Sequence, residues 1–150
     1  MSHSPSHRLV QTGGPPRRGS YLGRQGEALA AIEALHRDYP FDSDVAGVYA
    51  VLLAKEGRNE EAERQIRIAI ERGQGKNHFH QAEYDIGSAY ASMGQPRRAI
   101  EWLRRTAADG DPCYPRFAHD PDLNRIRDDP EFRSFLEGLR QQWEELNATL

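Results

Sequence analysis

From Leu22 onward, apolar residues recur three and four positions apart, with polar and charged residues between them. This spacing places the apolar side chains on one face of successive helices. The alternation of apolar and polar residues that marks a half-buried strand is not sustained anywhere in the sequence. The pattern therefore predicts an all-α protein built from amphipathic helices.

The segments 23–28, 57–62 and 94–99 each begin with a glycine and have an alanine five residues later. The first two glycines are 34 residues apart, and the second and third are 37 apart. Glycine ends helices because it adopts a left-handed conformation without strain, and alanine lets two helices cross closely. The spacing predicts a series of helical hairpins, with three extra residues in the connection at 73–77.

Small and aromatic positions extend this periodicity. In register with the glycines stand the following residues: Ala50, Leu53, Ala62, Gly87, Tyr90 and Ala99. Through these positions segments 44–73 and 82–110 resemble the tetratricopeptide repeat (TPR) family, and Pro40 falls where a repeat of that family ends. The resemblance implies an all-α, right-handed superhelical solenoid of antiparallel helix pairs, which acts as a non-enzymatic scaffold that binds other proteins.

The resemblance divides the chain into three parts. Residues 1–21, rich in Ser, Gly, Pro, Arg and His, are predicted to form a flexible tail. Repeats are predicted over 22–112, as a half-repeat at 22–40 and full repeats at 43–73 and 78–110. The half-repeat keeps only a helix near 24–38, because Gly-Gly-Pro-Pro precedes it and cannot continue a helix. Residues 113–150 are predicted to cap the repeats.

This last segment resembles the closing segment of certain bacterial TPR proteins, which often carry a protein kinase or transcription-regulator domain upstream. Asp120-Pro121 and Asp129-Pro130 each place a capping carboxylate before a proline, and so predict two helix starts. The final helix is predicted to cover the open end of the repeats with one apolar stripe. Its members are Phe132, Phe135, Leu136, Leu139, Trp143 and Leu146.

In the TPR family the first helix of each pair lines a concave groove. Carried over by register, the groove residues are Asp44, Gly47, Val48, Val51, Ala54, Lys55, Gln81, Tyr84, Asp85, Ser88 and Ser92. Only Lys55 is basic, so the set differs from the clamp with which chaperone-binding TPR proteins hold a terminal carboxylate. The mixture suits an extended or helical segment of a partner protein. The alternative is a solvated helix face that binds nothing.

Metal sites provide a competing hypothesis, a small metal-binding protein or hydrolase. His78 and His80 could bind a metal together with Asp85 or Glu83, but residues two apart point to different sides of a helix. In segment 120–131 the residues Asp120, Asp122, Asn124, Asp128 and Glu131 occupy oxygen positions of a calcium-binding loop. Arg125 stands where that loop needs glycine, so the sequence favours helix caps. We predict no catalytic residue, no metal and no cofactor.

Composition agrees with a thin helical array, with 37% hydrophobic and 29% charged residues. The net charge of -3 provides no basic field for nucleic acid or an anionic membrane. The single cysteine, Cys113, cannot form an internal disulfide. The sequence shows neither an apolar run of membrane-spanning length nor the apolar stretch of a signal peptide, so we expect a cytoplasmic protein.

The incomplete first repeat suggests further partners. Ala28, Ala31, Ile32 and Leu35 share a helical face that an intact repeat would cover. Two hypotheses explain its exposure: a homodimer through this half-repeat, or an origin as the end of a longer array. A third hypothesis, from the closing segment, is a regulatory remnant of a multidomain bacterial kinase or transcription regulator.

Overall fold

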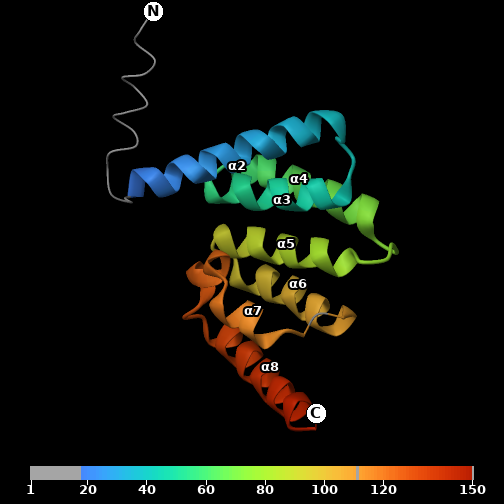
Figure 1. The fold of residues 1–150 in the computed structure, drawn as a ribbon, viewed down its shortest axis with the longest axis vertical. Helices are drawn as coiled ribbons and strands as arrows, with labels where there is room; N and C mark the ends of the chain where they lie inside the picture. Colours follow the sequence, from blue (N-terminus) through green and yellow to red (C-terminus); the bar gives the residue numbers. More distant parts are fainter. Residues whose placement is uncertain (1–17, 111, 150) are drawn as a thin grey trace, which may run out of the picture.

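The computed structural model describes residues 18–110 and 112–149, with side chains from Arg24 onward. These residues form helices and connecting turns, and they contain no strand, which confirms the predicted all-α class. Helices α2 to α8 form a stack with α2 at one end and α8 at the other (Figure 1). The elements are α2 (Arg18–Asp38), α3 (Ser43–Lys55), α4 (Asn59–Gly73), α5 (Phe79–Ser92), α6 (Pro96–Asp109), α7 (Tyr114–His119), the 3-10 helix η1 (Pro121–Ile126) and α8 (Pro130–Ala148).

The first helix begins earlier than the sequence suggested. Helix α2 starts at Arg18 rather than near Arg24, so residues 18–21 of the predicted tail are helical. Pro16 is the last proline before Pro40, so no proline ring interrupts the backbone hydrogen bonds of this segment. Residues 1–17 of the predicted tail lie outside the described residues.

Two helical hairpins, α3–α4 and α5–α6, turn in the same way. Gly57 and Gly94 both adopt the left-handed conformation, with φ of 79° and 74°. The amide of Arg58 donates to the carbonyl of Leu53 at 2.9 Å, and 37 positions later the amide of Gln95 donates to that of Tyr90 at 3.0 Å. The two turns therefore occupy equivalent places in two equivalent hairpins.

Small residues let the helices of each hairpin approach closely. Ala62 and Ala99, five residues after the two turn glycines, are fully buried. A Cβ added to Gly87 of α5 would lie 2.8 Å from the Cδ2 atom of Leu103 in α6. Since real Cβ atoms essentially never come so close to another atom, the α5–α6 packing requires glycine at this position.

Helix α2 packs on α3 through one apolar face. Leu29 and Ile32 are buried, whereas Ala28, Ala31 and Leu35 are exposed. The prediction that Ile32 belongs to the uncovered face is therefore wrong. Ile32 is one position from Ala31, about 100° around the helix, and this rotation turns it toward the stack.

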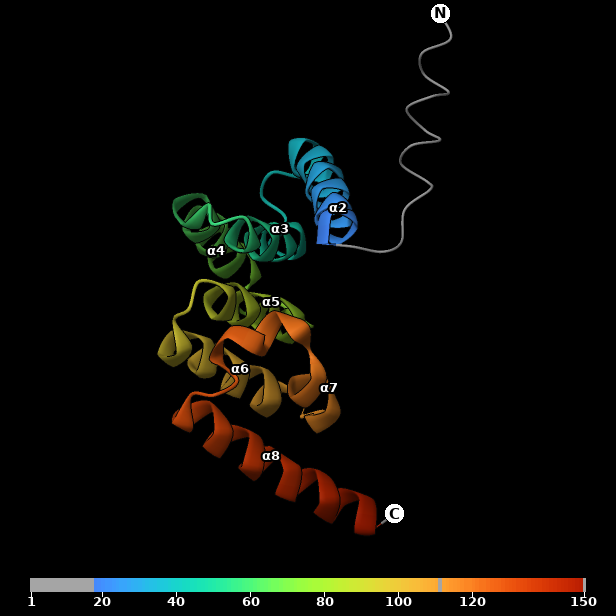
Figure 2. The same ribbon diagram turned by 90° about the vertical axis from the view of Figure 1, so that its left-hand side faces the viewer.

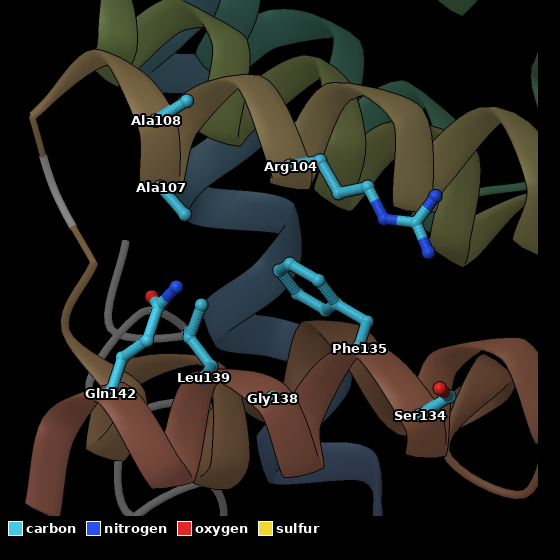
Figure 3. A pocket seen from close by; sticks show the side chains of 8 residues that line it. All are labelled: Arg104, Ala107, Ala108, Ser134, Phe135, Gly138, Leu139 and Gln142. Atoms are coloured by element: carbon cyan, nitrogen blue, oxygen red, sulfur yellow. The ribbon is translucent and has the colours of Figure 1, made fainter.

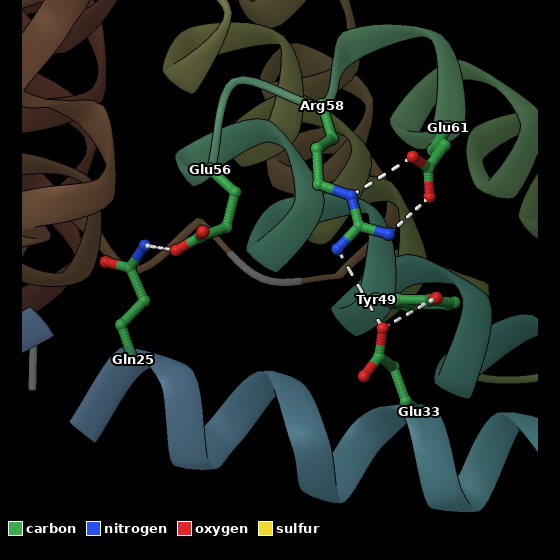
Figure 4. A network of polar contacts seen from close by, with 6 residues as sticks. All are labelled: Gln25, Glu33, Tyr49, Glu56, Arg58 and Glu61. Atoms are coloured by element: carbon green, nitrogen blue, oxygen red, sulfur yellow. Dashed lines mark hydrogen bonds and ion pairs between the residues drawn. The ribbon is translucent and has the colours of Figure 1, made fainter. Parts of the chain in front are cut away.

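A polar network fastens α2 to the hairpin beside it (Figure 4). Gln25 donates to Glu56 at 2.9 Å at the far end of α3. The Tyr49 hydroxyl donates to Glu33 at 3.5 Å, and the Arg58 guanidinium lies 3.9 Å from the same carboxylate. These contacts, together with the buried Leu29 and Ile32, connect α2 to the α3–α4 hairpin.

Both predicted helix caps are present at the C-terminal end. The Asp120 side chain accepts from the amide of Asp122 at 2.9 Å and begins η1, while Asp129 accepts from the amides of Glu131 and Phe132 and begins α8. Helix α8 packs against α6 and α7. Its predicted apolar stripe is covered only in its first half: Phe132, Phe135 and Leu139 are buried, Leu136 and Trp143 are half-buried, and Leu146 is exposed.

None of the described helices is both long and apolar enough to span a lipid bilayer.

Candidate functional site

The predicted groove lies on the face of α3 and α5 that the C-terminal part of the chain partly covers. We call residues 114–127, comprising α7 and η1, the C-terminal arm. The arm runs beside α5 (Figure 2), and η1 packs directly on α5. Leu123 and Ile126 of the arm are buried there, as is Phe117. The chain itself therefore occupies part of the groove that the sequence assigned to a partner.

Tyr84 is at the centre of this covered part. Its side chain is only 3% exposed, and its hydroxyl donates to the Asp120 carboxylate at 2.6 Å. The Phe117 ring packs edge-on at 5.3 Å, and the Arg116 guanidinium lies 3.7 Å from the centre of the Tyr84 ring. Burial and the neighbouring Asp120 carboxylate raise the pKa of Tyr84 well above its ordinary value. Tyr84 thus holds the arm in place and does not face solvent.

Three further predicted groove residues also contact the arm. The Gln81 side-chain oxygen accepts a hydrogen bond from Arg116 at 3.5 Å. Lys55 of α3 forms an ion pair with Asp122 of η1 at 2.5 Å. The backbone carbonyl of Ser92, at the end of α5, accepts a hydrogen bond from Arg125 at 2.6 Å. The arm is thereby connected to both helices of the predicted groove.

Arg127 gives the arm its shape. Its guanidinium donates to the carbonyl oxygens of Ala118 and Asp120, each at 2.7 Å, and to the Asn124 side chain at 3.1 Å. These bonds satisfy carbonyl groups at the end of α7 and hold η1 against it. The arm is therefore a folded unit of the protein.

Asp85 lies between α3 and the arm. A Cβ added to Gly47 of α3 would lie 3.2 Å from the Cβ of Asp85, so the two helices are close at this point. Burial raises the pKa of Asp85 to about 7, the Arg116 guanidinium opposes that rise, and the carboxylates of Asp44, Asp122 and Asp120 add to it. The covered face is thus acidic, with Arg116 and Lys55 beside its carboxylates.

The remaining predicted residues divide by exposure. Val51 and Ser88 are buried, with 6% and 1% of their surfaces exposed, so neither faces a partner in this arrangement. Asp44, Val48 and Gln81 are exposed, and Val48 keeps 40% of its surface. The accessible part of the predicted groove is therefore centred on α3 rather than α5.

Asp44, Val48 and Lys55 lie on one face of α3, because spacings of four and seven residues return to the same side of a helix. We call this face, together with the hollow at its Lys55 end, the α3 groove. The hollow, of about 330 Å³, lies between α2 and the arm. Its lining comes from α2, α3, the turn after α3, α5 and η1: Gln25, Ala54, Lys55, Gly57, Ser92, Pro121, Asp122, Asn124 and Arg125.

A second hollow, of about 320 Å³, lies between α6 and α8 (Figure 3). Phe135 and Leu139 point from α8 toward α6, where Ala107 faces them with a small side chain. Gly138 on α8 adds no side chain. We did not predict this hollow from the sequence, and the small residues on both helices are the signal that marks it.

Glu83 is a carboxyl that the sequence suggested only as a partner for His78 and His80, and its burial was not predicted. It is 3% exposed, its Oε1 atom has no hydrogen-bond partner, and it stands 37 positions after the buried Ala46. Burial raises the pKa of Glu83 to about 7, helped by a hydrogen bond with the Asp109 carboxyl, while Arg105 opposes the rise. Because the equivalent position of the α3–α4 hairpin is the alanine Ala46, a comparison of the two hairpin sequences could have predicted that the Glu83 carboxyl is buried.

The candidate metal ligands do not converge. The rings of His78 and His80 are 6.0 Å apart, and His78 precedes α5 in a left-handed conformation with φ of 68°. The Asp120 and Asp122 carboxylates face Tyr84 and Lys55 instead of each other. Within the described ranges, no three His, Cys, Asp or Glu side chains are grouped so that they could share a metal ion.

Comparison with known proteins found no match to any protein-family model, curated protein or solved structure.

Proposed function

We propose that this protein is a TPR-type interaction module without catalytic activity, and that it binds a helix or an extended segment of another protein. The equivalent α3–α4 and α5–α6 turns, 37 residues apart, support the TPR assignment. Stacked helical hairpins of this kind present long surfaces that suit peptide and helix ligands. The binding surface is the α3 groove, whose hollow lies between α2 and the C-terminal arm.

The exposed face of α3 is the observation that carries this proposal. Val48 is 40% exposed on a helix whose other aliphatic side chains are buried or half-buried. Exposed Asp44 lies one turn before it, and the hollow of about 330 Å³ begins beyond it at Lys55. A ligand segment with an apolar side chain over Val48, a basic side chain near Asp44 and a group that enters the hollow fits this sequence of features.

Affinity capture from extracts of the source organism tests the groove. The bait protein carries Val48→Glu, which places a charge at the centre of the α3 groove. The matched control is Gln141→Glu, which adds the same charge on exposed α8. We expect wild type and Gln141→Glu to retain a protein that Val48→Glu loses.

A photo-crosslinking amino acid at position 48 identifies what lies on the groove. It should label the retained protein, whereas the same group at position 141 should not. Capture of an identical set of proteins by Val48→Glu and wild type, with no label from position 48, contradicts the proposed groove.

A further inference from the structure

The outer side of α2 has a stripe of exposed residues that no described residue covers. Arg24, Ala28, Ala31, Leu35 and Asp38 follow one another at spacings of four, three, four and three, so they lie on one face. All five are exposed, and Leu35 keeps 45% of its surface. Helix α2 lies at one end of the stack, which leaves room on this side for another molecule (Figure 1).

Exposed apolar surface is concentrated at this end of the described part of the molecule. Of its five exposed large apolar residues, four lie on α2, on α3 or in the turn between them: Leu35, Tyr39, Phe41 and Val48. The fifth, Leu146, is at the far end on α8. Of these, Leu35 lies on the outer stripe of α2, whereas Val48 belongs to the exposed face of α3 described above.

We propose that a second copy of this chain covers the stripe, with the two α2 helices antiparallel about a two-fold axis at Ala31. Arg24 and Asp38 each lie seven residues from Ala31, in opposite directions. A two-fold axis at Ala31 therefore places Arg24 of each copy opposite Asp38 of the other copy. The stripe is complementary in charge to itself in this orientation and in no parallel one, where like charges meet.

These charges have no other pairing on the described surface. Arg24 and Asp38 are 14 positions apart, which is about 21 Å along a helix, so they cannot pair with each other within one chain. Among the described residues no side chain forms an ion pair with either of them. A second copy provides both pairs at once.

The centre of the stripe suits a close helix pair. Ala31 lies on the axis, so no large side chain separates the two backbones there. Leu35 of one copy lies four residues from the axis and Ala28 of the other lies three residues from it, so Leu35 packs over Ala28 twice by symmetry. The dimer thus buries the apolar centre and keeps the charged pairs at its two ends.

Charge exchange between two variants tests this arrangement directly. Arg24→Asp puts aspartate opposite Asp38, and Asp38→Arg puts arginine opposite Arg24, so each variant alone has like charges at both ends. We expect the dissociation constant of each variant's dimer to be about ten-fold higher than that of the wild-type dimer. In an equimolar mixture the two variants restore both opposite-charge pairs, and a heterodimer of near wild-type affinity should form.

Sedimentation velocity over a range of protein concentrations measures these affinities on the full chain. Helical circular dichroism shows that the variants are folded, and Gln141→Glu controls for a change in net charge away from α2. A wild-type chain that stays monomeric at every concentration overturns the proposal. So does a dimer that Arg24→Asp leaves unchanged, or a mixture that forms no heterodimer. None of these outcomes tests the proposed α3 groove, because none of the variants changes a residue of α3.

Discussion

Gly87→Ala tests the close approach of α5 and α6, on which the repeat arrangement depends. The change adds one methyl group in the middle of α5, where it would lie 2.8 Å from Leu103 Cδ2, 2.9 Å from Leu103 Cγ and 3.3 Å from the carbonyl oxygen of Ala99. Leu103 is fully buried and the carbonyl belongs to the α6 backbone, so neither can move aside cheaply.

Two opposing effects determine the magnitude. Alanine in place of glycine inside a helix stabilises by about 0.5–1 kcal/mol, because the unfolded chain has less freedom to lose. Overpacking of a dense core destabilises by about 1–3 kcal/mol. The clash is larger, so Gly87→Ala should lower the free energy of unfolding by about 1–2 kcal/mol net. For a chain of this size, the midpoint temperature should fall by about 2–4 °C per kcal/mol.

Gly138→Ala is the matched control. Gly138 lies inside α8, and a Cβ added there meets no atom within 4 Å. The same substitution should therefore stabilise by about 0.5–1 kcal/mol at this position. Urea unfolding followed by circular dichroism measures both variants, and an unchanged slope with denaturant shows that the midpoint shift reports stability.

Whether Gly87→Ala lowers or raises the free energy of unfolding decides whether the clash with α6 is real. If Gly87→Ala is as stable as wild type or more stable, the helices do not cross at this position as closely as the structure has them. Equal stabilisation by Gly87→Ala and Gly138→Ala would have the same meaning, since helix propensity alone would then explain both.

Three further changes test the C-terminal arm, a helix cap and the buried carboxyl. Tyr84→Phe removes the bond to Asp120 and should destabilise by about 2 kcal/mol, since the acceptor is a carboxylate; an unchanged urea midpoint would refute this contact. Asp129→Ala removes the cap of α8 and should cost about 1 kcal/mol in the same assay, whereas no loss means that α8 starts without it. For Glu83 the pKa rises from its ordinary 4.5 to about 7, so the folded chain keeps a proton that the unfolded chain loses between these values, and stability should fall as pH rises through that window, by about 3 kcal/mol. Glu83→Gln should remove the part of this fall that Glu83 causes, while Asp85, whose pKa is also raised to about 7, keeps the rest, and the variant should be more stable than wild type near pH 8; a pH profile parallel to that of wild type would contradict the raised pKa.

Features that depend on neighbouring residues in the chain could be predicted from sequence. The turns at Gly57 and Gly94 follow from glycine's tolerance of positive φ, and both glycines have it. The caps of η1 and α8 follow from aspartate before proline, because each carboxylate reaches amides two or three residues further on. The amphipathic spacing likewise placed Phe132, Phe135 and Leu139 on the buried face of α8, although on α2 it grouped the buried Ile32 with the uncovered face.

Spacing could not determine which faces are covered. Lys55 and Asp122 are 67 residues apart, and their pairing depends on where the C-terminal arm returns over α5. Residues expected to meet a partner, Tyr84 above all, therefore meet the arm instead. The local pattern makes a face apolar or polar, but burial is a property of everything that packs against that face. For this reason the raised pKa values of Asp85 and Glu83, the hollow beside Lys55 and the uncovered side of α2 emerged only from the assembled stack.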